Sequence, residues 1–128
     1  MRNAKWCAAA IVTIAISACQ TWGPTWSELT GARYTVVDPN REAAILIRAG
    51  DQTIGPSMPF KLDPGKYEIQ VQSPVHNQFP GSIKTMSLNV EPCRRYYINA
   101  QFKDRVGPDW TPVIDYVERI AGCRLPAG

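Results

Sequence analysis

The sequence predicts an all-β domain, a small β-sandwich of about seven short strands. From Tyr34 onward, short apolar stretches are separated by proline, glycine, asparagine and aspartate, which is typical of strands joined by turns. Two segments, 66–72 and 95–102, alternate apolar with polar residues, as half-buried strands do. No amphipathic segment is long enough to indicate a helix. Together these observations favour two packed sheets over a helical or mixed fold.

The candidate strands follow one another along the chain as a series of apolar stretches. They are 33–37, 43–48, 52–54, 58–62, 66–72, 85–90, 95–102 and 111–119. One segment has a competing interpretation, because Asp38-Pro39 would also suit the cap and first turn of a helix over 41–48. We predict a strand there, since Gly50-Asp51 directly after it suits a hairpin.

The clearest turn signal is Asp63-Pro64-Gly65. Proline fixes one φ angle and glycine tolerates a positive φ, so this triplet predicts a tight turn. After the turn, Tyr67, Ile69 and Val71 fall on one face of the strand, and polar residues fall on the other. We therefore expect this strand to have one dry and one wet side.

Length and charge indicate one small domain. The chain has 128 residues and a formal net charge of +3 at pH 7. Two of the 14 basic residues, Arg2 and Lys5, lie in a segment that we expect to be removed, which leaves 12 basic against 11 acidic residues. A balance this close to neutral gives no reason to expect a nucleic-acid partner.

The first 18 residues have the layout of a secretory signal peptide. Arg2 and Lys5 precede the apolar run 6–16, and the small residues Ser17 and Ala18 follow it. A helix that crosses a bilayer needs about 20 apolar residues, so this run is too short for a permanent anchor. We therefore expect residues 1–18 to be cleaved off.

The end of this segment resembles the lipobox of bacterial lipoproteins. Ile16-Ser17-Ala18-Cys19 matches three of its four positions, with Ile in place of Leu. The resemblance implies that Cys19 becomes the first residue and carries covalent lipid, since two or three acyl chains attach a protein to a membrane firmly. Gln20 stands where an aspartate would retain such proteins at the inner membrane, which favours the periplasmic face of the outer membrane. The alternative is a secreted protein cut after Ser17, which would leave Cys19 as an unpaired thiol.

Two cysteines remain for the folded domain. Cys7 leaves with the signal peptide and Cys19 is taken by lipid, so Cys93 and Cys123 are expected to form a disulfide in the oxidising envelope. Such a loop is expected to contribute about 3.7 kcal/mol through the chain entropy of the unfolded state. A zinc site would need more ligands, and we expect neither a metal nor another cofactor beyond the lipid on Cys19.

The mature chain is predicted to begin with a tether. Residues 19–32 contain Pro24, two glycines and no apolar periodicity, so we place the β-sandwich domain at 33–128. Trp22 and Trp26 are exceptions in this tether. They would suit either the lipid headgroup region or the domain's own surface, and the sequence leaves both alternatives open.

Several motifs in the domain resemble PEGA-type modules, which are small Ig-like β-sandwiches of bacterial envelope proteins. They are Pro59-Phe60, the segment from Leu62 to Tyr67, and Leu88-Asn89-Val90. The segments 92–97, 110–113 and 120–123 resemble a set of uncharacterised bacterial lipoproteins. This resemblance implies that Cys93 and Cys123 staple the last strand or loop to the start of the preceding strand, and it supplies no catalytic residue.

The sequence offers poor material for catalysis, so we do not expect an enzyme. Ser73 and the only histidine, His76, lie close in sequence, but nothing places them in hydrogen-bonding geometry. Asp115 and Glu118 are three residues apart on a predicted strand and would point to opposite faces. A hydrolase is therefore the weakest hypothesis.

The function we expect is that of a non-catalytic binding or assembly module, held by lipid on the outer membrane and contacting a protein of the cell envelope. Its candidate binding surface is an aromatic platform that includes Tyr97 and Trp110. The alternative is a periplasmic sensor or carrier that binds a glycan or another small ligand. A concave pocket at these residues would favour the small ligand, whereas a flat apolar patch or a long strand edge would favour a protein.

Overall fold

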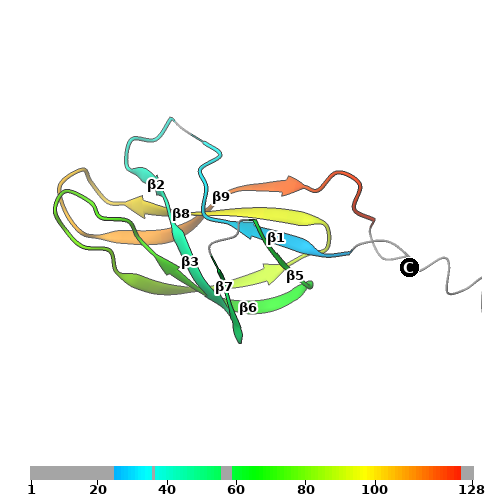
Figure 1. The fold of residues 1–128 in the computed structure, drawn as a ribbon. Coiled ribbons are helices and arrows are strands. Elements are labelled where there is room, and N and C mark those ends of the chain that lie inside the picture. Colours follow the sequence, from blue (N-terminus) through cyan, green and yellow to red (C-terminus); the bar gives the residue numbers. More distant parts are fainter. Residues whose placement is uncertain (1–24, 36, 56–58, 125–128) are drawn as a thin grey trace, which may run out of the picture.

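The protein is an all-β structure of two packed sheets, seen here in a computed structural model (Figure 1). The structure describes residues 25–35, 37–55 and 59–124. These ranges contain no helix, and so none that is long and apolar enough to cross a membrane. The all-β prediction is confirmed. The predicted signal peptide 1–18, the predicted lipidation site Cys19 and Trp22 lie outside the described residues.

Nine strands make up the two sheets within these described ranges, rather than the predicted seven or so. Sheet A contains β1 (Ser27–Thr30), β2 (Arg41–Ala43), β5 (Phe60–Leu62), β8 (Arg94–Phe102) and β9 (Trp110–Arg119). Sheet B contains β3 (Ile45–Ala49), β4 (Gln52–Thr53), β6 (Gly65–Gln72) and β7 (Ile83–Val90). Strand β8 is central in sheet A, with β9 along one side and both β1 and β2 along the other. In sheet B the order is β4-β3-β6-β7.

Strand β1 lies within the segment that the sequence predicted as a tether, so that prediction is wrong from Ser27 onward. All four β1 residues are buried, and the strand pairs with β5 antiparallel and with β8 parallel. The sequence contains only one aliphatic residue here, Leu29, and its side chain is fully buried. Trp26, just before β1, packs under the Lys61 ammonium, which lies 4.4 Å from its ring centroid. The domain therefore begins before residue 33.

Two other predicted strands differ from the structure. The described residues of 33–37 form a loop, because the backbone N–H groups of Tyr34 and Thr35 donate to the Asp115 carboxylate instead of to a strand. The predicted strand 43–48 is divided at Ala44, where the chain passes from β2 in sheet A to β3 in sheet B. Ala44 N donates to Gly31 O there, and a Cβ on Gly31 would lie 1.9 Å from the Ala44 oxygen. Only glycine fits this approach.

The Asp63-Pro64-Gly65 turn carries the chain between the sheets, from β5 to β6. Tyr67 closes the turn by donating its hydroxyl to Asp63 O at 2.7 Å. In β6, Ile69 and Val71 are fully buried. The polar residues between them are more exposed, which confirms the predicted alternation.

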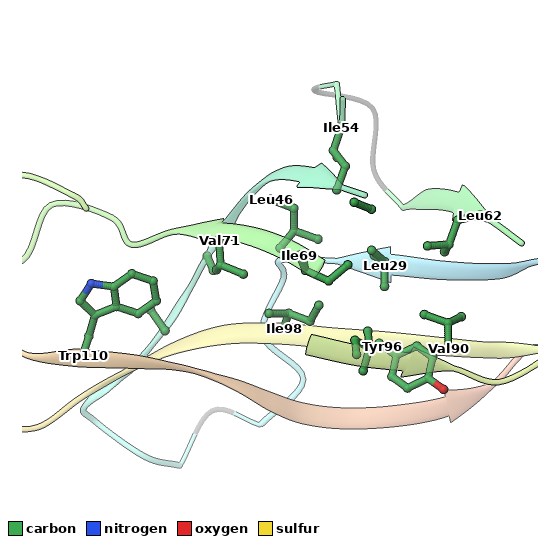
Figure 2. Packing of buried hydrophobic residues seen from close by; sticks show 14 of the residues in the cluster. Leu29, Leu46, Ile54, Leu62, Ile69, Val71, Val90, Tyr96, Ile98 and Trp110 are labelled. Carbon is green, nitrogen blue, oxygen red and sulfur yellow. The ribbon is translucent and has the colours of Figure 1, made fainter. Parts of the chain in front are cut away.

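A single core fills the space between the sheets (Figure 2). Sheet A contributes Leu29, Leu62, Tyr96, Ile98, Ala100, Phe102 and Trp110, and sheet B contributes Leu46, Ala49, Ile69, Val71, Leu88 and Val90. Trp110 closes this core at the start of β9, where its indole N–H donates to Ser82 Oγ at 2.7 Å. The two sheets thus depend on the same buried residues.

The cysteine pair joins the turn after β7 to the segment after β9. The Sγ atoms of Cys93 and Cys123 lie 2.05 Å apart, at disulfide distance, and their Cα atoms lie 5.5 Å apart. The predicted pairing is therefore present in the structure. The backbone reinforces it, because Ile120 N donates to Cys93 O at 3.0 Å.

Candidate tyrosine binding surface

The outer face of sheet A carries a row of charges across three strands. Glu28 of β1, Arg95 of β8 and Glu118 of β9 lie side by side in register. Arg95 donates from Nε to Glu28 at 2.6 Å and from Nη1 to Glu118 at 2.5 Å. Glu28 is buried, so its charge is stabilised by this arginine, which fixes the register of the three strands.

Three tyrosines gather in the next row, and we call them the tyrosine surface: Tyr34, Tyr97 and Tyr116. Tyr97 and Tyr116 are partners on β8 and β9. The Tyr34 ring, from the loop after β1, stacks on Tyr116 with centroids 3.9 Å apart and planes within 7°. It meets Tyr97 edge to face at 5.3 Å. Tyr34 and Tyr116 remain 50% and 40% exposed, so the cluster presents aromatic area to solvent.

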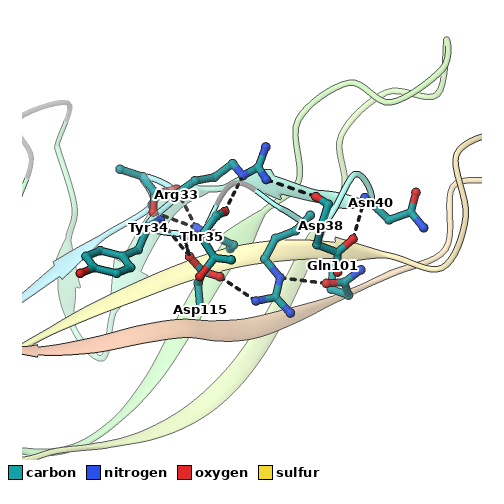
Figure 3. Close-up of polar contacts among 11 residues, drawn as sticks. Arg33, Tyr34, Thr35, Asp38, Asn40, Gln101 and Asp115 are labelled. Atoms are coloured by element: carbon teal, nitrogen blue, oxygen red, sulfur yellow. Dashed lines mark hydrogen bonds and ion pairs between the residues drawn. The ribbon is translucent and has the colours of Figure 1, made fainter.

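A carboxylate at a bulge in β9 positions this surface (Figure 3). The register shifts between Tyr97 and Ile98, and Asp115 is the extra residue on β9. Its Oδ2 accepts the N–H groups of Tyr34 and Thr35, both at 2.8 Å, and its Oδ1 accepts Arg41 Nη1 at 2.6 Å. Asp115 therefore holds the loop that carries Tyr34 over the sheet.

The loop is fastened at further points. The fully buried Asn99 of β8 donates its side-chain amide to Gly31 O and Ala32 O, at 3.1 and 2.9 Å. Arg33 donates to two carbonyls of its own loop, those of Thr35 and Asp38. These hydrogen bonds hold the loop against sheet A, so the Tyr34 ring is already in position before a partner binds.

Two hydroxyl groups of the surface, those of Tyr97 and Tyr34, have raised pKa values and stay protonated. Burial and the neighbouring Glu118 carboxylate, which accepts the hydroxyl of Tyr97 at 3.0 Å, raise the pKa of Tyr97. The hydrogen bond with Tyr116 raises the pKa of Tyr34. Burial alone would raise the pKa of Asp115, but hydrogen bonds from Thr35, Arg41 and Tyr34 outweigh it and hold that pKa below its usual value. The surface thus offers neutral donors beside anchored carboxylates.

Of the two residues predicted for the aromatic platform, Tyr97 lies on the surface and Trp110 does not. Tyr97 lies on the outer face as expected, but Trp110 pairs with Phe102, points into the core and is only 3% exposed. Sequence reasoning missed Tyr34 and Tyr116 and placed Asp115 and Glu118 on opposite faces of a regular strand. The bulge was not visible in the sequence, and it brings Asp115 to the tyrosine surface.

The structure also shows the contacts of the residues that were considered for catalysis. Ser73 Oγ accepts Ser82 N, while His76 bonds Glu42 at 2.6 Å and Asp104 O at 3.0 Å and stacks on Phe102. The structure thus gives Ser73 and His76 different partners. Asp115 and Glu118 are likewise engaged in structural contacts. Over the described ranges, no group of three or more His, Cys, Asp or Glu residues is placed to hold a metal ion.

Two hollows in the surface lie away from the tyrosines. One, of about 440 Å³, is formed by β6 and β7 around Tyr67 and Leu88. The other, of about 450 Å³, lies beside Lys84, Lys103 and Asp109, and buried Trp110 forms part of its floor. Both are open to solvent, and neither is lined by a residue of the tyrosine surface.

Comparison with known proteins finds no matching family model, curated protein or solved structure. The resemblance to PEGA-type modules and to bacterial lipoproteins therefore stays an expectation from sequence motifs. The fold and the tyrosine surface define the class of protein as a disulfide-bonded β-sandwich with an exposed aromatic patch.

Proposed function

We propose that this protein is a lipoprotein of the outer membrane, attached through lipid on Cys19, that acts as a non-catalytic binding module and contacts a protein of the cell envelope through Tyr34, Tyr97 and Tyr116. The anchor follows from the lipobox-like segment that ends at Cys19. The tether confines the domain to one surface and so raises its effective concentration for partners there.

The observation that carries the binding role is the stacked pair of Tyr34 and Tyr116. Two large rings remain 50% and 40% exposed, and Asp115 holds one of them in place. Tyrosine supplies apolar area together with a hydroxyl donor, and it loses little side-chain entropy on binding, which is why it is enriched in protein interfaces. Preorganisation by Asp115 lowers the cost of ordering the loop when a partner binds.

The shape of the surface favours a protein over a small ligand. Tyr34 covers Tyr116 and leaves no slot between the rings, since their centroids are 3.9 Å apart. The two hollows lie elsewhere. A flat aromatic patch suits a partner that is itself broad, whereas small ligands are held in concave sites.

The test is a crosslinking pull-down from intact envelopes, with wild type, Cys19→Ala and the double variant Tyr34→Ala/Tyr116→Ala. We expect wild type in the membrane fraction with a reproducible protein partner. Cys19→Ala should leave the membrane fraction, and the double tyrosine variant should stay in it but lose the partner. Loss of two interface aromatics is expected to lower affinity by about 2 kcal/mol or more, roughly 30-fold.

The matched control is Phe79→Ala, which removes an equally exposed aromatic ring, 41%, from the loop between β6 and β7. This variant should retain the partner. If Cys19→Ala stays in the membrane, the anchor assignment is wrong. If the double tyrosine variant captures the partner as well as wild type does, the tyrosine surface is not the binding site. A lipidated wild type that captures only envelope glycans would establish the glycan alternative instead.

A further inference from the structure

The end of the sandwich where β1 begins carries arginines that form no ion pair with another described residue. Arg94 at the start of β8 and Arg119 at the end of β9 are directly opposite each other in the register. Like charges in this position repel each other, so the two arginines lower the stability of the fold unless they bind an anionic group. Within the described part of the chain, the Arg94 guanidinium donates to the neighbouring Cys93 O at 3.3 Å, and neither arginine forms an ion pair.

A third arginine lies beside the disulfide at the same end. Arg124 directly follows Cys123 and is exposed. We call Arg94, Arg119 and Arg124 the basic end. Its nearest carboxylates along the chain are Glu91, in the turn before β8, and Glu118, which is occupied by Arg95. Of these two carboxylates Glu91 forms no ion pair within the described residues, and Asp63, which follows the Ser27 partner Leu62, is a further carboxylate at this end.

The chain from the proposed lipid site arrives at this same end. Ser27, the first residue of β1, donates its hydroxyl to Glu91 O and accepts Arg94 N, which places β1's start at the basic end. Figure 1 shows the start of β1 and the end of β9 on the same side of the molecule. Cys19 precedes Thr25 by six residues, which span at most about 22 Å. Whatever holds Cys19 is thus close to these arginines.

From this geometry we infer that the basic end binds the anionic phospholipid headgroups of the membrane that carries the anchor. The inference rests on the proposed lipidation of Cys19. Arginine forms paired hydrogen bonds to phosphate, and an anionic bilayer attracts basic groups within about a Debye length, near 8 Å at physiological salt. The basic end then faces the bilayer, and Tyr34 and Tyr116, on the outer face of sheet A, stay accessible from the side.

The experiment uses the unlipidated chain from residue 19 with Cys19→Ala, which retains all nine strands and the disulfide; circular dichroism checks its fold. Binding is measured to vesicles of phosphatidylcholine alone and of phosphatidylcholine mixed with phosphatidylglycerol. We expect binding only to the anionic vesicles, weakened when the ionic strength rises from about 0.1 M to about 1 M. Arg94→Gln/Arg119→Gln should lower the partition coefficient roughly 30-fold, about fivefold for each charge.

The matched control is Lys103→Gln/Arg105→Gln, which removes the same charge from the loop after β8, at the opposite end of that strand. It should change binding less than about twofold. The inference is overturned if the wild-type domain does not bind the anionic vesicles. It is also overturned if both double variants weaken binding equally, because binding would then depend only on the net charge of the protein. Because this protein lacks the lipid, the result is independent of the anchor, which the membrane fraction of Cys19→Ala tests separately.

Discussion

Asp115 shows how one residue connects the sheet to the candidate site. Its carboxylate accepts two backbone N–H groups and one guanidinium N–H, and its side chain is shielded from solvent. These bonds stabilise the ionised form and keep the pKa of Asp115 below its ordinary value of 3.8 despite its burial. Stability from this residue is therefore fully present above about pH 4 and is lost as the pH falls through the lower pKa of the folded state.

The first prediction concerns Asp115→Asn, which keeps the size of the side chain and removes its charge. At neutral pH the variant should lose about 1.5–3 kcal/mol of unfolding free energy, the usual contribution of a hydrogen bond to a charged group. Urea denaturation of both proteins at about pH 6 and about pH 2 measures this loss. The difference should shrink at the acidic pH, because the unfolded wild type then binds a proton at Asp115 and the folded state, with its lowered pKa, loses its advantage. An equal difference at both pH values would show that charge is not the cause.

Single residues also explain which site features the sequence did not predict. Tyr97 was identified because strand alternation placed it on the polar face of 95–102. Trp110 was misplaced because the last strand was expected to begin at Thr111, whereas β9 begins one residue earlier and turns the indole into the core. Tyr34 reaches the surface only because Asp115, 81 residues away, binds its backbone. Local patterns do not encode such contacts.

At the scale of elements, periodicity predicted the long strands and failed for the short one. Strands β6 and β8 bury one face each, so alternation was readable. Strand β1 has the sequence Ser-Glu-Leu-Thr, and three of its four buried residues are polar. Their burial depends on distant partners, such as Arg95 for Glu28 and Glu91 O for Ser27. Because the sequence does not show these partners, its pattern at 27–30 looks the same as that of a tether.

The second prediction tests whether β1 is part of the folded domain. Leu29 is fully buried between β5 and β8, so Leu29→Ala should lower the unfolding free energy by about 2–5 kcal/mol. The control is Val37→Ala, whose side chain is 83% exposed and which should change stability by less than about 0.5 kcal/mol. Thermal and urea denaturation of both variants measure this. Equal stabilities would mean that residues 27–30 are a tether after all.

At the scale of the whole molecule, the two sheets share one core and should unfold together. Residues of sheet A and sheet B belong to a single buried cluster, and the chain passes between the sheets four times, at Ala44, between β4 and β5, at Asp63-Pro64-Gly65 and between β7 and β8. Neither sheet has a second hydrophobic layer within the described residues, so neither can bury its apolar face alone. A domain of this size with one core is expected to behave as one cooperative unit.

The third prediction uses the disulfide to test that cooperativity. Cys93 and Cys123 are separated by 30 residues, and this loop contains both β8 and β9 of sheet A, so reduction should destabilise the folded state by about 3.7 kcal/mol. If the sandwich is one unit, hydrogen exchange of amides in β6 of sheet B must lose as much protection as that of amides in β8. Exchange is compared in Cys93→Ser/Cys123→Ser and wild type. Loss confined to β8 and β9 would mean that sheet B folds without sheet A, and the shared core would then not be the source of stability.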